Sequence, residues 1–182
     1  YLGRQPVLDR NQALYGYELL FRSARQGEAD ETGLTATAAV IAHAAQLGLA
    51  RAIGDAACFL NVDAEVLGSD IFAFLPRERT VLEIVPTVVP DDALLARMRE
   101  LAGHGFRFAL DGIEGDSLRL QRLLPLAGFV KLDLLTVPPT QLPNLVRRLH
   151  GMEKTVVAEK VETRDAYQAA MDLGFDYFQG FY

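Results

Sequence analysis

Short apolar runs of strand length alternate with segments of helical periodicity along most of this chain, and this alternation constrains the fold more than any other feature. The strand-like runs cover residues 58–62, 80–85, 106–110, 129–132, 155–158 and 177–181. Between them, residues 141–150 place apolar side chains at positions i, i+3, i+4 and i+7, and residues 91–101 place them at i, i+1, i+4 and i+7. Both spacings are typical of an amphipathic helix. Strands that alternate with helices predict right-handed βαβ units and a mainly parallel sheet.

The N-terminal part departs from this alternation. Two strand-like runs, residues 5–8 and 15–21, flank the polar segment 9–12 (Asp-Arg-Asn-Gln), and this arrangement predicts a β-hairpin. A charged stretch over residues 23–33 and an alanine-rich helix over residues 35–49 are expected to follow. With both hairpin strands counted, we predict an α/β fold, a modified TIM (β/α)8 barrel whose first strand is antiparallel to its neighbour. An open, doubly wound sheet is the alternative.

Length, charge and cysteine content narrow the class of protein. The chain has 182 residues, of which 50% are hydrophobic, and this predicts a single domain over residues 1–182. A net charge of −6 excludes a chain-wide basic surface for nucleic acid, and the apolar runs are too short to span a bilayer. The single cysteine, Cys58, excludes an internal disulfide and favours a cytoplasmic location. Because the sequence opens on Tyr1 and ends on a strand-like run, we expect a piece of a longer protein, truncated at its C-terminus.

Nearly every expected strand ends on a polar side chain that can act as a ligand. These residues are Glu18, Asn61, Glu83, Asp111, Lys131, Glu159 and Gln179. One acid at a strand end most simply caps a helix, but a closed barrel directs all seven residues toward one opening, which we call the mouth. Several carboxylates repel one another unless cations lie among them, and oxygen ligands favour Mg²⁺, Mn²⁺ or Ca²⁺ over zinc. Two such ions are a common device for phosphodiester hydrolysis, with Lys131 adding a positive charge beside the attacked phosphate.

These residues lie in short motifs that resemble the EAL domain family. Residues 17–22 (Tyr-Glu-Leu-Leu-Phe-Arg) are similar to the Glu-Ala-Leu-x-Arg signature that names the family. The motifs Leu-Asn-Val, Leu-Glu-Ile, Phe-Ala-Leu-Asp, Lys-Leu-Asp, Ala-Glu-Lys-Val-Glu-Thr and Gln-Gly follow in the family's order and cover nearly the whole chain. The opening Gly-Arg-Gln-Pro-Val-Leu-Asp resembles a subgroup in which a shortened EAL domain precedes an HDOD domain, so an HDOD domain is expected to follow.

The resemblance implies an activity and a role for each mouth residue. EAL domains are modified TIM barrels that hydrolyse cyclic di-GMP to the linear dinucleotide with two Mg²⁺ or Mn²⁺ ions, and they often form dimers. The roles implied by position are metal ligation by Glu18, Asn61, Glu83, Asp111 and Gln179, catalysis by Lys131 and Glu159, and nucleotide contacts by Gln5 and Arg22. A homodimer is implied in the same way.

Two positions depart from the family's pattern. The family's loop Asp-Asp-Phe-Gly-Thr-Gly begins at Asp111 here, so that Gly112 replaces a carboxylate that helps to hold the ion pair. Pro86 replaces a glutamate that braces the same loop. Because hard ions depend on the number of anionic oxygens, these changes predict a degenerate site with weakened Mg²⁺ or Mn²⁺ binding, unless Glu114 or Asp116 reaches back as a substitute ligand.

Three functions are compatible with this sequence. The departures favour a catalytically inactive regulatory module in bacterial cyclic di-GMP signalling, which acts through contacts with other proteins or with the HDOD domain. A cyclic di-GMP receptor and a weak Mg²⁺- or Mn²⁺-dependent phosphodiesterase are the alternatives. His43, His104 and His150 lie in or at the ends of expected helices, away from the strand ends, and we expect no chemical role for them.

Overall fold

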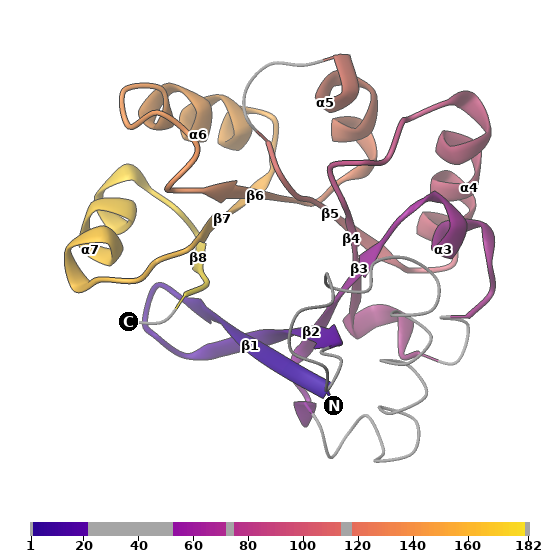
Figure 1. Ribbon diagram of the computed structural model, residues 1–182, viewed down its shortest axis with the longest axis horizontal. Helices are drawn as coiled ribbons and strands as arrows, with labels where there is room; N and C mark the ends of the chain where they lie inside the picture. Colours follow the sequence, from indigo (N-terminus) through magenta and orange to yellow (C-terminus); the bar gives the residue numbers. More distant parts are fainter. Residues whose placement is uncertain (1, 22–52, 72–74, 114–117, 181–182) are drawn as a thin grey trace, which may run out of the picture.

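The protein forms a closed barrel, seen in a computed structural model that describes residues 2–21, 53–71, 75–113 and 118–180 (Figure 1). The strands in these ranges are β1 (Leu2–Asp9), β2 (Leu14–Phe21), β3 (Ala57–Val62), β4 (Thr80–Ile84), β5 (Arg107–Leu110), β6 (Phe129–Asp133), β7 (Thr155–Glu159) and β8 (Tyr177–Phe178). They pair in chain order. β1 is antiparallel to both of its neighbours, β2 and β8, and every other neighbouring pair is parallel. The predicted modified barrel with an antiparallel first strand is therefore confirmed, and the open sheet is excluded.

Helices surround this ring of strands on its outer side (Figure 1). The helical elements are α3 (Ala64–Gly68), η1 (Arg77–Arg79), α4 (Asp92–Gly103), α5 (Leu118–Leu123), η2 (Leu124–Leu126), α6 (Leu142–Gly151) and α7 (Arg164–Leu173). Capping side chains define three of the helix starts: the Asp91 carboxylate accepts a hydrogen bond from the Leu94 amide at 2.8 Å, and Asp63 and Thr163 cap α3 and α7 in the same way. Among these helical elements, none is long and apolar enough to cross a membrane.

Several sequence-based expectations fall outside the described residues. They are the charged stretch 23–33, the helix 35–49, Arg22, His43, Glu114 and Asp116. The other two histidines lie at helix ends as predicted: His104 follows α4 directly, and His150 is in the last turn of α6.

Successive residues of the parallel strands β3 to β7 contribute alternately to two hydrophobic clusters, and this separates the inside of the barrel from the outside. In β3, Cys58 and Leu60 pack in the cluster that contains the helix residues, whereas Ala57 and Phe59 belong to the other cluster. The inner cluster consists of Val7, Ala57, Phe59, Val81, Ala109, Phe129 and Val157, with Tyr15 and Tyr177 packed against it. Apolar side chains therefore fill the end of the barrel at which the parallel strands begin, and the polar residues lie at the end at which these strands finish. Cys58 is fully buried, which raises the pKa of its thiol to about 12 and excludes it as a nucleophile.

Candidate functional site

The mouth residues lie on the inner face of the barrel. Nearly all of them come two positions after an interior residue, at or just past the end of a strand. These pairs are Phe59 and Asn61, Val81 and Glu83, Ala109 and Asp111, Phe129 and Lys131, Val157 and Glu159, and Tyr177 and Gln179. Side chains two positions apart in a strand share a face. Glu18 joins them from the hairpin, since it pairs with Gln5 of β1 on one side and Phe59 of β3 on the other.

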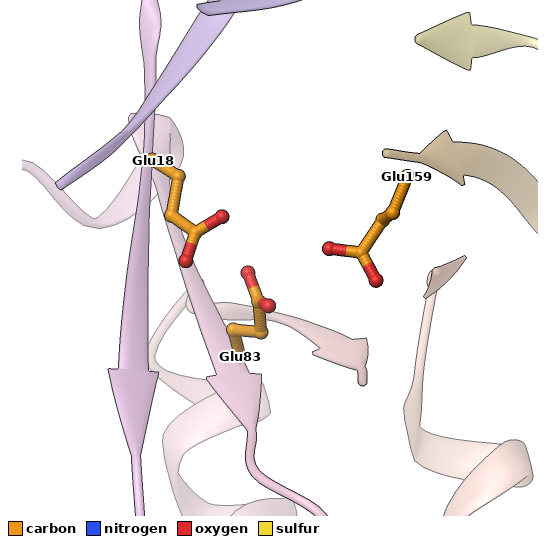
Figure 2. Close-up of side chains that lie close together, drawn as sticks. All are labelled: Glu18, Glu83 and Glu159. Carbon is orange, nitrogen blue, oxygen red and sulfur yellow. The ribbon is translucent and has the colours of Figure 1, made fainter. Parts of the chain in front are cut away.

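Three glutamates from strands far apart in the sequence point toward one another (Figure 2). Each of Glu18, Glu83 and Glu159 offers a carboxylate oxygen, and these oxygens all lie within 4.8 Å of one another. The Lys131 ammonium contacts all three carboxylates, with its Nζ 2.6 Å from Glu83 Oε1, 2.7 Å from Glu159 Oε1 and 3.1 Å from Glu18 Oε2. Only 1% of the Lys131 side chain is exposed, so this cation is held inside the barrel by charge pairing.

Two amide side chains hold Glu18 in place. Asn61 Nδ2 donates to Glu18 Oε1 at 2.8 Å, and Gln179 Nε2 donates to Glu18 Oε2 at 2.5 Å. The same Gln179 amide donates to Gln5 Oε1 at 3.0 Å. Glu18 is therefore fixed by residues from β1, β3, β6 and the end of β8, and its orientation depends on closure of the whole barrel.

Burial and charge shift the pKa values of the buried acids in different directions. Burial tends to raise the pKa of Glu18, but the Lys131 charge and the hydrogen bonds from Gln179, Lys131 and Asn61 outweigh it, so that the pKa is lowered. Burial and the Glu18 charge raise the pKa of Glu83 well above its ordinary value, although Lys131 opposes the shift.

Glu159 and Lys131 complete this electrostatic arrangement. Burial raises the pKa of Glu159 to about 7, against the lowering influence of Lys131. Burial alone would lower the pKa of Lys131, but the charges of Glu83, Glu18 and Glu159 reverse the effect and raise it well above the ordinary value. The mouth therefore combines a permanent cation with one acid that gains or loses its proton near neutral pH.

The donor atoms of the mouth fit a hard divalent cation. Within the described ranges, the buried oxygens Glu83 Oε2 and Gln179 Oε1 have no hydrogen-bond partner. A buried carboxylate oxygen without a partner is energetically costly, and a cation removes that cost. All candidate ligands are oxygens, which is the set that Mg²⁺, Mn²⁺ and Ca²⁺ prefer.

Asp111 lies at the edge of this group. Asp111 is half-buried and close enough for its charge to raise the pKa of Glu83 and of Glu159. Its Oδ1 accepts a hydrogen bond from the Gly112 amide at 2.5 Å, and it does not belong to the close group of three glutamates.

Sequence reasoning assigned no role to two residues that border the mouth. Asp133 follows Lys131 by two positions in β6 and pairs with Lys160 through a 2.8 Å contact between Lys160 Nζ and Asp133 Oδ2. Lys160 follows Glu159 directly and has a left-handed backbone with φ of 55°. The two-residue spacing could have identified Asp133, whereas the pairing with Lys160 depends on the β6–β7 register.

Comparison with known proteins identifies relatives of the same architecture. The family model described as the EAL domain matches residues 64–182. The cyclic di-GMP phosphodiesterase CdgJ of Vibrio cholerae is 33% identical over 187 residues, which cover 100% of this chain and 43% of CdgJ. The chain thus spans less than half the length of this curated relative.

Solved structures show the same fold. The EAL-domain protein YkuI of Bacillus subtilis, in complex with cyclic di-GMP and calcium, matches 97% of this chain and 53% of its own, with a TM-score of 0.76 and 24% identity. The manganese and cyclic di-GMP complex of BlrP1 from Klebsiella pneumoniae matches 99% of this chain and 54% of its own, with a TM-score of 0.75 and 20% identity.

Proposed function

This chain belongs to the EAL domain family, and from that membership we propose that its mouth binds cyclic di-GMP with a divalent cation and hydrolyses the nucleotide slowly. The observation that carries the proposal is the group of three glutamates around buried Lys131. A mouth rich in carboxylates attracts an anionic phosphodiester only through cations. The name of CdgJ, a relative aligned over the whole of this chain, favours the same substrate.

The divalent ion would be held by oxygens of Glu18, Glu83 and Glu159, with Asn61 and Asp111 as further ligands. When bound there, such an ion polarises a phosphoryl oxygen and lowers the pKa of a coordinated water. Mg²⁺ and Mn²⁺ are the ions we propose, because the donors are carboxylate and amide oxygens.

Four residues of the chain carry the remaining roles in this proposal. Glu159 accepts the proton of the attacking water, because an ion bound in the mouth keeps this carboxylate ionised. Lys131 supplies a fixed positive charge where negative charge develops on the phosphate. Gln5, on the neighbouring β1 strand and hydrogen-bonded to Gln179, contacts the nucleotide together with Arg22.

Two further functions are supported by one specific observation each. The absence of a side chain at Gly112 favours a cyclic di-GMP receptor without turnover, because a weakened ion site loses catalysis before it loses binding. The position of Asp111 outside the close group of three glutamates favours a regulatory module without catalysis, which acts through an attached domain, such as HDOD, or through a second copy of the chain.

Two measurements on the same sample test the proposal. Cyclic di-GMP is titrated calorimetrically into the protein with Mn²⁺ or Mg²⁺, and the sample is then analysed by chromatography for linear product. We expect binding and slow product formation, both lost in EDTA. Glu159→Gln should abolish product while leaving a folded protein. Lys154→Met serves as the control because Lys154 precedes β7, at the end of the barrel opposite the mouth.

Each outcome identifies one function. Product that depends on Glu159 supports the phosphodiesterase. Binding without product overturns hydrolysis and establishes a receptor. No binding with either ion overturns both and leaves the module that acts through protein contacts.

A further inference from the structure

The loop that follows Asp111 packs against the loop that follows β4. Gly112 has a left-handed backbone with φ of +63°, and a Cβ atom built at this position would lie 2.3 Å from Pro86 Cγ and 3.1 Å from Pro86 Cβ. Atoms at 2.3 Å overlap strongly, so no side chain fits at position 112 while Pro86 stays in place. The two departures from the family's pattern are therefore one packing feature.

Arg119 of α5 holds the segment that carries Pro86. Its guanidinium donates hydrogen bonds to the main-chain oxygens of Val85 at 2.8 Å, Val88 at 3.2 Å and Ile84 at 3.4 Å. The Val85 amide in turn donates to Val62 O of β3 at 3.2 Å. Pro86 is thus fixed between anchored residues, and its ring cannot move away from Gly112 without breaking several hydrogen bonds.

The Lys131 ammonium already uses part of the ligand set. It takes one oxygen from each of Glu18, Glu83 and Glu159, and Glu83 Oε2 is a buried carboxylate oxygen that has no partner in the described part of the chain. Two ions about 4 Å apart need additional carboxylates around and between them. Position 112, the next along the loop from Asp111, cannot supply one.

We propose that the mouth holds one divalent ion instead of two, that Lys131 acts as its second cation, and that the Pro86–Gly112 contact keeps the number of ions at one. The inference deepens the proposed function, because it rests on the mouth as the ion site. It makes Pro86 the residue that excludes a ligand side chain from position 112. The number of bound ions can be measured without nucleotide, so the inference can fail or succeed independently of cyclic di-GMP binding.

The test is to count bound Mn²⁺ ions per chain by equilibrium dialysis with metal analysis. We expect one Mn²⁺ in the unmodified protein and one in Pro86→Ala. Gly112→Asp combined with Pro86→Ala should bind two, because alanine removes the Cγ atom that lies 2.3 Å from the new Cβ position. Gly112→Asn with Pro86→Ala is the matched control, since it adds the same bulk without the charge and should bind one.

A count of two in the unmodified protein would overturn the inference, as would a count of zero. A count of one in the folded Gly112→Asp, Pro86→Ala variant would also overturn it. Thermal melting separates packing from ligation: Gly112→Asp alone should melt lower than the double variant. A single bound Mn²⁺ without any cyclic di-GMP binding would refute the proposed function and leave the ion count intact.

Discussion

At the scale of the residue, Glu159 links ion binding to pH. Its pKa of about 7, against an ordinary value of 4.5, shows that the folded protein without an ion favours the protonated form. The stability contributed by this group is therefore fully present below pH 4.5 and is lost as the pH rises through 7. An ion reverses the preference, because a ligand carboxylate must give up its proton.

Mn²⁺ affinity should consequently rise with pH. We expect an increase of about tenfold per pH unit for each proton that the ion displaces, from Glu159 and from Glu83, because the pKa values of both carboxyl groups are raised. Titration of Mn²⁺ into the protein on both sides of neutral pH measures this slope. In Glu159→Gln the slope should flatten, and an unchanged slope would show that another group carries the competing proton.

At the scale of the element, the end of β8 depends on one glycine. A Cβ atom at Gly180 would lie 1.9 Å from the main-chain oxygen of Val161, whose amide donates to Gln179 O at 3.0 Å. Any side chain at position 180 must therefore push Gln179 away from the segment after β7. Gln179 holds Glu18, so a backbone contact controls the geometry of the mouth.

Gly180→Ala should lower the free energy of unfolding by about 3 kcal/mol. It should also weaken Mn²⁺ binding, because the hydrogen bond from Gln179 to Glu18 is lost. Urea denaturation measures the first effect, with Gly128→Ala as the control, since a Cβ atom there meets nothing within 4 Å. We expect the control to change stability by less than about 0.5 kcal/mol. Equal effects of the two substitutions would contradict the assigned contact.

At the scale of the whole molecule, the barrel closes through a ladder as short as any of the others, since the β5–β6 and β7–β8 ladders also have two residue pairs each. β1 and β8 share two residue pairs, Leu8 with Phe178 and Asp9 with Tyr177. Arg10 reinforces this seam, because its guanidinium donates to Phe175 O at 2.6 Å and to Met171 O at 3.1 Å. The hairpin is thereby tied to the end of α7, which precedes β8 in the chain.

Arg10→Met should loosen this seam before any other part of the barrel. We expect a loss of about 1 kcal/mol in the free energy of unfolding and faster hydrogen exchange at Tyr177 and Phe178. Exchange in β4 should stay unchanged. Arg164→Met, which alters an exposed arginine of α7, is the control. Uniformly faster exchange in all strands would show instead that the barrel opens only by global unfolding.

The sequence by itself determined the order of the strands and helices, the antiparallel hairpin and the set of mouth residues. Each of these follows from local periodicity: apolar runs define strands, and a polar residue two positions after an interior residue faces the mouth. Six of the seven mouth residues are linked by direct contacts, with Lys131 paired to three glutamates and two amides bonded to Glu18, whereas Asp111 lies at the edge. Their individual roles stay predictions.

Only the tertiary structure decided which of these residues touch, and how tightly. Pro86 occupies the space beside Gly112 from a loop after a different strand, Arg119 reaches three carbonyls from a helix, and Arg10 bridges positions more than 160 residues apart. No local pattern encodes such contacts, because they depend on strand register and barrel closure. The same closure buries Glu159 beside Lys131 and so raises its pKa to about 7, a value that the sequence of the strand could not predict.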